Sequence, residues 1–169
     1  LLLGLGYGIG YMGIGLNWMR AIFVEAMLGI VLVTSLVYVL LAALIFAVRR
    51  LAGWPLGVAA AEVTVEGLIS RFPFDGFGWM RVGYALTYAP LAGLYPLAGV
   101  PGVTFVVALI AQGLLWLLDR TSLRRLAAVA AGVALVATAA WAGSAVPAGT
   151  PPSTVSIGWV QGGAPGGGV

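Results

Sequence analysis

Two glutamates are the residues of this sequence best placed to do chemistry. Glu62 and Glu66 lie four positions apart in an apolar segment, so a helix would place both carboxyl groups on one face. The 169-residue chain contains no cysteine and no histidine, and its basic residues are all arginine. Serine and threonine therefore lack a histidine or lysine base, which excludes the usual routes of nucleophilic catalysis. A glutamate could still act as a general base toward a proton within hydrogen-bond reach.

The surroundings of these two carboxyl groups predict a lipid environment. The chain is 62% hydrophobic and 8% charged, which is too apolar for a soluble domain. A charged side chain at the centre of a bilayer costs about 2.5–3.5 kcal/mol on insertion scales. Glu62 and Glu66 should therefore face a polar interior, pair with Arg71 or Arg81, or carry a proton. A structural ion pair and a place in a substrate site both stay open, and we predict no metal site and no cofactor.

A loop rich in aromatic residues follows the glutamates. Residues 70–84 read SRFPFDGFGWMRVGY, with two arginines, one aspartate and five aromatic residues between apolar runs. An aromatic belt at the membrane surface is one interpretation. Pro73, Gly76 and Gly78 favour a second one, because they predict a bent loop that a belt does not need.

Apolar runs predict about five membrane-spanning helices. A helix needs about 20 apolar residues to cross the hydrocarbon core, and residues 27–48 form the clearest such run, without a single charge. Residues 82–99 contain Pro90 and Pro96 with several glycines, so we expect irregular or re-entrant backbone there, and a helix that begins at Pro101. The expected spans are residues 1–19, 27–48, 56–69, 101–118 and 126–146.

The glycines near the N-terminus predict close helix packing. Gly8, Gly10 and Gly13 match a dinucleotide-binding pattern, but no strand precedes them and no acidic residue follows about 20 positions later. The pairs Gly4/Gly8 and Gly6/Gly10 have the spacing with which small residues let two membrane helices approach. The net charge of +3 is small, and we predict no nucleic-acid partner.

The arginines predict the orientation in the membrane. Five of the eight lie in the stretches 49–50 and 120–125, which the predicted helices bring to one side, and cytoplasmic loops are rich in arginine. The loop 70–84 and everything after residue 146 would then be extracytoplasmic. Residues 147–154 form a linker rich in proline, and the segment 155–169 opens with VSIGWVQGG, which alternates as a β-strand does. The fold class is therefore an all-α polytopic membrane domain, residues 1–146, followed by the first strand of a truncated extracytoplasmic domain.

Three segments of the chain read EGLISRFPFDGFGWMRVGY, PLAGLYPLAGVPGVTFVVALIAQGLL and VSIGWVQGGAP. In order and spacing they resemble the apolipoprotein N-acyltransferase family. Glu66 matches a glutamate of that family, residues 76–79 match its loop, residues 83–84 its Gly-Tyr pair, and residues 160–162 the opening of its nitrilase-like α/β domain. The segment SRFPFDGF and the absence of lysine resemble actinobacterial members.

The chain departs from the family pattern at three positions. Gly78 stands where the family usually has proline, and Gly163 where it commonly has asparagine. Ile69 replaces an arginine often found three residues after the glutamate. We therefore expect Arg71 to be the partner of Glu66 instead.

The resemblance implies a bacterial enzyme of the cytoplasmic (inner) membrane that crosses it several times. Such enzymes transfer an acyl chain from a phospholipid to the amino group of diacylglyceryl-cysteine in a lipoprotein, through a thioester on a cysteine that would lie beyond residue 169. This chain would position both lipid substrates in the bilayer, contain no catalytic residue and be inactive alone. A polyprenol-phosphate mannose synthase is a further expected partner. The expected substrate-binding residues are Trp79, Phe77, Arg71, Glu66, Arg81 and Tyr84.

Two other functions stay open at this point. A non-catalytic membrane scaffold for a polyprenol-phosphate mannosyltransferase would need no external catalytic half. A transporter fragment would explain glutamates and broken helices within the membrane, but not a chain that leaves the membrane into a strand.

Overall fold

The computed structural model describes residues 1–73, 75–119, 122–147 and 158, and in this part of the chain helices are joined by turns and loops, without a strand. The predicted linker and nitrilase-like strand lie, apart from Pro147 and Gly158, outside the described residues. The α-helices are α1 (Leu2–Gly15), α2 (Val24–Val48), α3 (Trp54–Ile69), α4 (Tyr95–Asp119) and α5 (Leu123–Ser144). The short 3-10 helices are η1 (Asn17–Ala21), η2 (Gly78–Met80), η3 (Val82–Leu86) and η4 (Pro90–Leu94).

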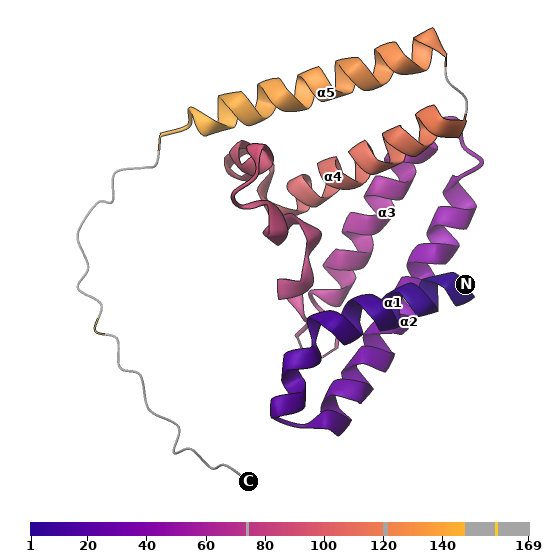
Figure 1. Ribbon diagram of the computed structural model, residues 1–169, viewed down its shortest axis with the longest axis vertical. Helices are drawn as coiled ribbons and strands as arrows, with labels where there is room; N and C mark the ends of the chain where they lie inside the picture. The colour runs from indigo at the N-terminus through magenta and orange to yellow at the C-terminus, as the bar shows by residue number, and fades with distance from the viewer. Residues whose placement is uncertain (74, 120–121, 148–157, 159–169) are drawn as a thin grey trace.

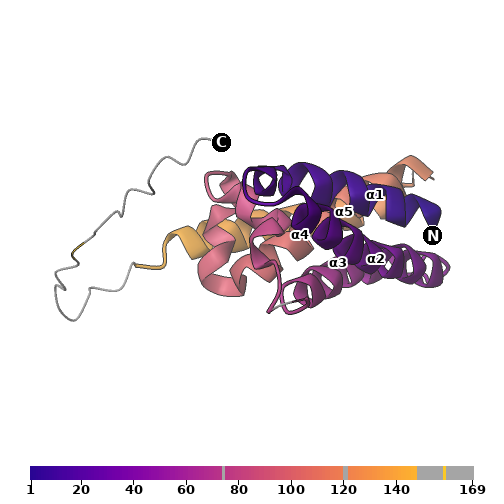
Figure 2. The ribbon, with the colours of Figure 1, turned by 90° about the horizontal axis from the view of Figure 1, so that it is seen from below.

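Helices that are consecutive in the chain are neighbours in space (Figure 1 and Figure 2). α1 packs on α2, α2 on α3 and α3 on α4, while α5 rests on η4 and on part of α4. The larger core cluster lies between α1, α2, α3 and the loop that follows α3, with Met12, Tyr38, Val65 and Phe77 among its members. A smaller cluster around Leu94, Val103 and Ala140 joins η4, α4 and α5.

Within the described ranges, three stretches are long and apolar enough to cross a membrane: Val24–Val48, Pro90–Asp119 and Leu123–Ser144. α1 and α3, with 14 and 16 residues, are shorter than the roughly 20 residues that a span needs. Large apolar side chains such as Leu32, Leu118 and Leu135 are exposed on the helix surfaces. Lipid is the solvent that accepts such a surface, so the predicted helical membrane protein is confirmed, and the count of five spans stays a prediction.

The irregular stretch before α4 forms as predicted, but α4 begins earlier than expected. η2, η3 and η4 occupy most of residues 78–94, and α4 then begins at Tyr95 rather than at Pro101. Gly99 interrupts α4 with φ 62° and ψ −172°, a conformation that glycine adopts without steric cost. Pro101 therefore lies in the first turn of the second helical segment, where its missing N–H breaks no hydrogen bond.

One of the two predicted glycine pairs makes the contact between α1 and α2. A Cβ atom at Gly4 would lie 2.5 Å from the carbonyl oxygen of Tyr38, and one at Gly8 would lie 2.8 Å from the Cα atom of Ser35. Gly6 and Gly10 have no neighbouring atom within 4 Å of such a Cβ. The prediction is correct for Gly4 and Gly8, whereas the pair Gly6/Gly10 faces away from α2.

Gly8→Ala is therefore expected to push α1 away from α2, because the obstructing atoms belong to the backbone of Ser35. We expect the free energy of unfolding to fall by about 1–3 kcal/mol, as for other overpacked sites. Gly10→Ala is the matched control on the same helix and should be neutral or slightly stabilising. Thermal unfolding in detergent measures both variants, and equal losses would refute the proposed α1–α2 contact.

Candidate functional site

The loop 70–84 folds back onto the ends of α1, α3 and α4 (Figure 1). After α3 ends at Ile69, the chain reverses at Asp75 and Gly76, which have φ values of 63° and 88°. The N–H of Phe77 then donates to the carbonyl of Ile69 at 2.8 Å, which closes the turn on the end of α3. The predicted bend at Gly76 is thus confirmed.

Glu66 ties the far end of this loop to α3. Its side chain is 5% exposed, and Oε1 accepts a hydrogen bond from the N–H of Val82 at 2.7 Å. Its other oxygen, Oε2, is buried and has no hydrogen-bond partner among the described residues. The hydroxyl of Ser70 donates to the backbone carbonyl of Glu66 at 2.6 Å and accepts from Nε of Arg81 at 2.9 Å. The side chains of Glu66 and Ser70, one turn apart at the end of α3, therefore hold Val82 and Arg81.

Three hydroxyl groups from other helices fix the next part of the loop backbone. The hydroxyl of Tyr11 in α1 donates to the carbonyl of Met80 at 2.7 Å. The hydroxyl of Tyr95 donates to the carbonyl of Gly83, and the N–H of Gly83 donates to Oγ1 of Thr104 at 3.0 Å. Backbone groups at membrane depth need internal partners, and these hydroxyls supply them. We refer to Tyr11, Glu66, Ser70, Tyr95 and Thr104 as the loop clamp.

The expected ion pair between a glutamate and an arginine is absent from the residues that the structure describes. Nη1 of Arg71 instead donates to the carbonyl of Gly67 at 2.9 Å, so the prediction that Arg71 is the partner of Glu66 is wrong. The physical reason is that the backbone N–H of Val82 already occupies one carboxylate oxygen inside the protein, while Arg71 extends along the exposed side of α3.

The six expected substrate-binding residues divide into exposed and buried groups. Arg71, Trp79 and Tyr84 are exposed, with 54% of Trp79 and 46% of Tyr84 accessible. Phe77 is 9% exposed and meets the ring of Trp79 edge to face, with 5.0 Å between the ring centroids. The partly buried Arg81 and the buried Glu66 hold the loop. The indole of Trp79 and the guanidinium group of Arg71 are thus exposed on a loop whose backbone is held by the loop clamp.

Sequence reasoning missed the three hydroxyl-bearing residues of the clamp in α1 and α4. Tyr11, Tyr95 and Thr104 are isolated polar side chains in apolar segments, and each bonds to a backbone group. Their hydroxyl groups could have indicated this role from the sequence, because a polar group buried in an apolar segment needs a hydrogen-bond partner. The described part of the chain also holds no group of three or more acidic, histidine or cysteine residues that could bind a metal ion.

Comparison with known proteins places the chain in a family. The model of the apolipoprotein N-acyltransferase N-terminal domain matches residues 1–113. An apolipoprotein N-acyltransferase of Methylococcus capsulatus is 35% identical over 152 residues, which cover 80% of this chain and 30% of that protein. The protein of the same name from Haemophilus ducreyi is 30% identical over 114 residues, covering 63% of this chain and 23% of that protein.

The chain spans less than a third of the length of these two curated relatives. A shorter match, 44% identical over 69 residues, is to an apolipoprotein N-acyltransferase of Bordetella bronchiseptica, of which it covers 13%. No solved structure matches the chain. The family model covers most of the helical bundle together with the complete loop 70–84, and on this ground the chain belongs to the apolipoprotein N-acyltransferase family.

Proposed function

We propose that this chain is the membrane part of an apolipoprotein N-acyltransferase and that it positions lipid substrates beside an extracytoplasmic active site. The observation that carries the proposal is the clamped loop 70–84, whose backbone is held by side chains of three helices while Trp79 and Arg71 stay exposed. Membership of the family supports it. The names of the relatives given above lend no support to a mannosyltransferase partner, which is no part of this proposal.

The proposed reaction has two steps and uses residues outside this chain. In the first step, a cysteine thiolate of a nitrilase-like domain attacks the ester carbonyl of a phospholipid, a thioester forms and a lysophospholipid leaves. In the second, the amino group of diacylglyceryl-cysteine attacks the thioester, an amide forms and the thiol is released. Both substrates are anchored in the bilayer, so a membrane domain that orients them beside the thiol converts two encounters into short lateral moves.

The charges at the two ends of the bundle support the orientation that we propose. Arg49, Arg50, Arg124 and Arg125 lie at the end where α2 turns into α3 and α5 begins, which we place in the cytoplasm. The loop 70–84 lies at the other end, so we place it on the extracytoplasmic side of a bacterial inner membrane, together with the chain that follows α5. An active site beyond residue 169 would then be on the same side as the loop.

Within the loop we assign different roles to the exposed and buried residues. The indole of Trp79, which Phe77 supports, would contact acyl chains and the interface, where an apolar ring with a polar N–H is favoured. Arg71 would bind a lipid phosphate through its guanidinium group. Tyr84 is also exposed, and we assign it to the same substrate-binding surface. Glu66 and Arg81 would hold the loop in place.

Trp79→Ala and Arg71→Ala in the full-length enzyme are each expected to lower kcat/KM for acyl transfer from phospholipid by about tenfold. For Arg71 this corresponds to one charge-assisted hydrogen bond, and for Trp79 to part of the apolar contact of its ring. Trp18→Ala and Arg20→Ala are matched controls, because both residues lie on η1 outside the loop and Trp18 is 55% exposed against 54% for Trp79. A fluorescent phospholipid and a lipoprotein peptide give the rates. Unchanged rates in the loop variants, or equal losses in the controls, would contradict the assignment.

A further inference from the structure

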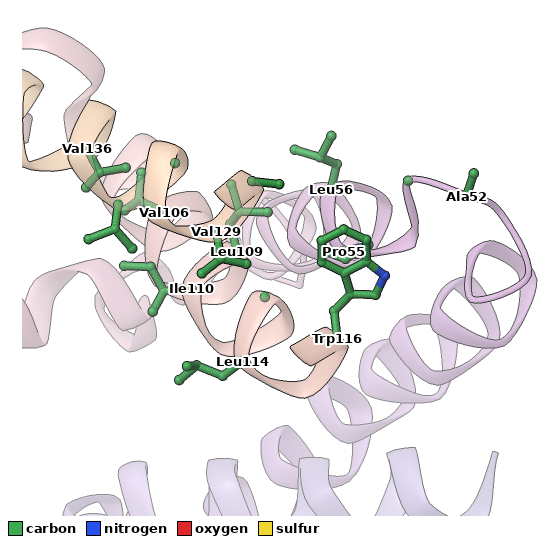
Figure 3. A pocket seen from close by; sticks show the side chains of 15 residues that line it. Ala52, Pro55, Leu56, Val106, Leu109, Ile110, Leu114, Trp116, Val129 and Val136 are labelled. Atoms are coloured by element: carbon green, nitrogen blue, oxygen red, sulfur yellow. The ribbon is translucent and has the colours of Figure 1, made fainter. Parts of the chain in front are cut away.

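A hollow lies near the opposite end of the bundle from the loop 70–84. It is a groove of about 310 Å³ between the start of α3, the C-terminal half of α4 and the first half of α5 (Figure 3). Every residue that lines it is apolar or glycine. The lining includes Ala52 and Pro55 around the start of α3, Val106 and Trp116 in α4, and Gly132 and Val136 in α5.

The length of the groove matches one leaflet of a bilayer. Along α4 its lining runs from Trp116 back to Val106, and ten residues of α-helix span about 15 Å. Along α5 it runs from Ala128 to Val136, or about 12 Å. The hydrocarbon core of a bilayer is about 30 Å thick, so one leaflet supplies about 15 Å of acyl chain.

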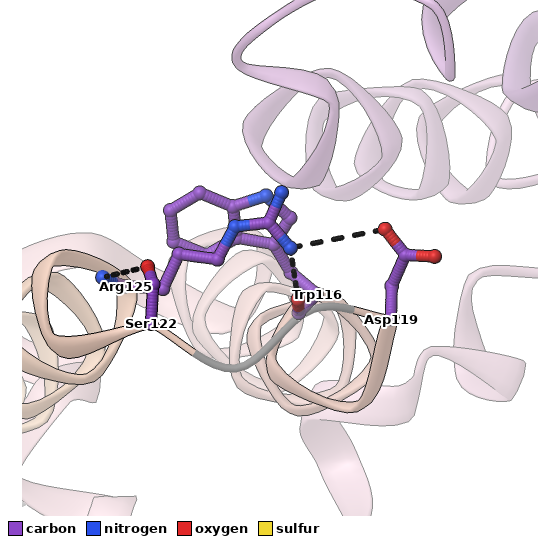
Figure 4. Close-up of polar contacts among 4 residues, drawn as sticks. All are labelled: Trp116, Asp119, Ser122 and Arg125. Carbon is purple, nitrogen blue, oxygen red and sulfur yellow. Dashed lines mark hydrogen bonds and ion pairs between the residues drawn. The ribbon is translucent and has the colours of Figure 1, made fainter.

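The Trp116 end of the groove is charged. The guanidinium group of Arg125 stacks over the indole of Trp116, 4.7 Å from the ring centroid, and Nη1 donates to the Trp116 carbonyl at 2.8 Å (Figure 4). The same nitrogen lies 3.7 Å from Oδ2 of Asp119. Arg125 thus holds the indole of Trp116, which lines this end of the groove, and places a positive charge beside it.

Other arginines lie at the same end of the bundle. Arg49 and Arg50 lie over the ring of Phe46, at 4.8 and 5.6 Å, but Arg49 and Phe46 line a different hollow between α1 and α2. Arg124 is exposed at the start of α5. Asp119 is the one acidic side chain at this end among the described residues, and it faces Arg125. At the start of α5, Arg124 and Arg125 outnumber Asp119, so this rim carries a net positive charge.

We infer that this groove binds one acyl chain of an anionic phospholipid, with the phosphate at the arginine rim. An apolar groove of one-leaflet length fits an acyl chain, and the positive rim favours an anionic headgroup over a zwitterionic one. In the proposed orientation this lipid belongs to the cytoplasmic leaflet. It is therefore separate from the acyl donor, which we place at the loop 70–84 on the far side.

A groove-filling variant tests the site directly. Gly132 lines the groove, and a Cβ atom there has no neighbour within 4 Å, so Gly132→Phe adds an aromatic ring at the groove wall without a clash at its first carbon. Ala130→Phe is the matched control on the same helix, at an exposed position that does not line the groove. Each full-length protein is reconstituted in nanodiscs of equal parts phosphatidylglycerol and phosphatidylethanolamine, and retained lipid is counted by native mass spectrometry.

We expect the unmodified protein and Ala130→Phe to retain phosphatidylglycerol preferentially, and Gly132→Phe to lose this preference. Arg124→Gln should weaken phosphatidylglycerol binding about fivefold, which corresponds to about 1 kcal/mol for one arginine near the membrane surface. Retention of phosphatidylglycerol by Gly132→Phe at the unmodified level would overturn the inference. So would equal retention of both lipids by the unmodified protein.

A helix from elsewhere in the full-length protein is the competing occupant. In that case Gly132→Phe would lower the thermal stability of the protein without any change in retained lipid, and the lipid site would be refuted. Because the readout is retained lipid rather than acyl transfer, failure of this inference and failure of the proposed enzymatic function are distinguishable.

Discussion

Glu66→Ala is expected to release the loop 70–84 from α3 and to lower the free energy of unfolding by about 1–3 kcal/mol. The N–H of Val82 donates to Oε1 of Glu66 at 2.7 Å and would lose its acceptor in a partly buried place. Acyl transfer by the full-length enzyme should fall as well, because Trp79 and Arg71 depend on the same loop for their position. Thermal unfolding in detergent and kcat/KM for the phospholipid measure the two effects.

Two controls separate the hydrogen bond from the charge. Glu66→Gln retains an oxygen at the position that accepts from Val82, so it should preserve most of the stability and activity that Glu66→Ala loses. Glu62→Gln removes the neighbouring carboxylate, which makes no hydrogen bond to the loop among the described residues, and should leave the loop in place. Equal losses in Glu66→Gln and Glu66→Ala would show that the clamp does not act through this hydrogen bond.

Gly76→Ala is expected to have a comparable or larger effect on stability. The residue has φ 88°, and a Cβ atom there would lie 2.0 Å from the carbonyl carbon of Ser70 and 2.3 Å from the nitrogen of Arg71. Both obstacles are backbone atoms at the end of α3, so relief requires the last turn of α3 or the loop to move. Strain and overpacking together predict a loss of about 2–5 kcal/mol.

Gly78→Ala is the matched control for Gly76→Ala within the same loop. A Cβ atom at Gly78 would lie 3.6 Å from Oγ of Ser70, which is an ordinary contact, so this variant should be close to neutral. Unfolding curves of the two alanine variants compare them directly. Equal midpoints would contradict the turn at Gly76 and with it the position of the loop.

The helices were largely predictable from the sequence, because each long apolar run forms a helix and the charged residues beside it mark where the helix ends. Expected residues 27–48, 56–69 and 126–146 correspond to α2, α3 and α5, with each end within three residues. The arginines at 49–50 follow directly on α2, and the loop of mixed charge follows α3. The start of α4 was mispredicted because residues 95–98 already form helix ahead of the break at Gly99, and composition does not reveal a short helical segment among prolines and glycines. Pro101 does lie in the first turn after that break.

The clamp was only partly predictable. The sequence directed attention to Glu66 and to the loop, but the partner of Glu66 is the backbone N–H of Val82, and backbone groups leave no signature in residue types. The glycine pairs illustrate the same limit. Gly4/Gly8 and Gly6/Gly10 have identical spacing, yet only the first pair faces α2, and spacing alone does not give the direction of a helix face.

The most direct test of the central claim asks whether the clamped loop and the arginine turn lie on opposite sides of the membrane. The chain contains no cysteine, so Tyr88→Cys, beside the loop, and Leu51→Cys, beside Arg50, each introduce one at an exposed position. Labelling of intact spheroplasts with a membrane-impermeant maleimide is compared with the protein lacking the added cysteine. Our account predicts labelling of Tyr88→Cys in intact spheroplasts and of Leu51→Cys only after the membrane is permeabilised. The reverse pattern, or labelling of both in intact spheroplasts, would contradict it.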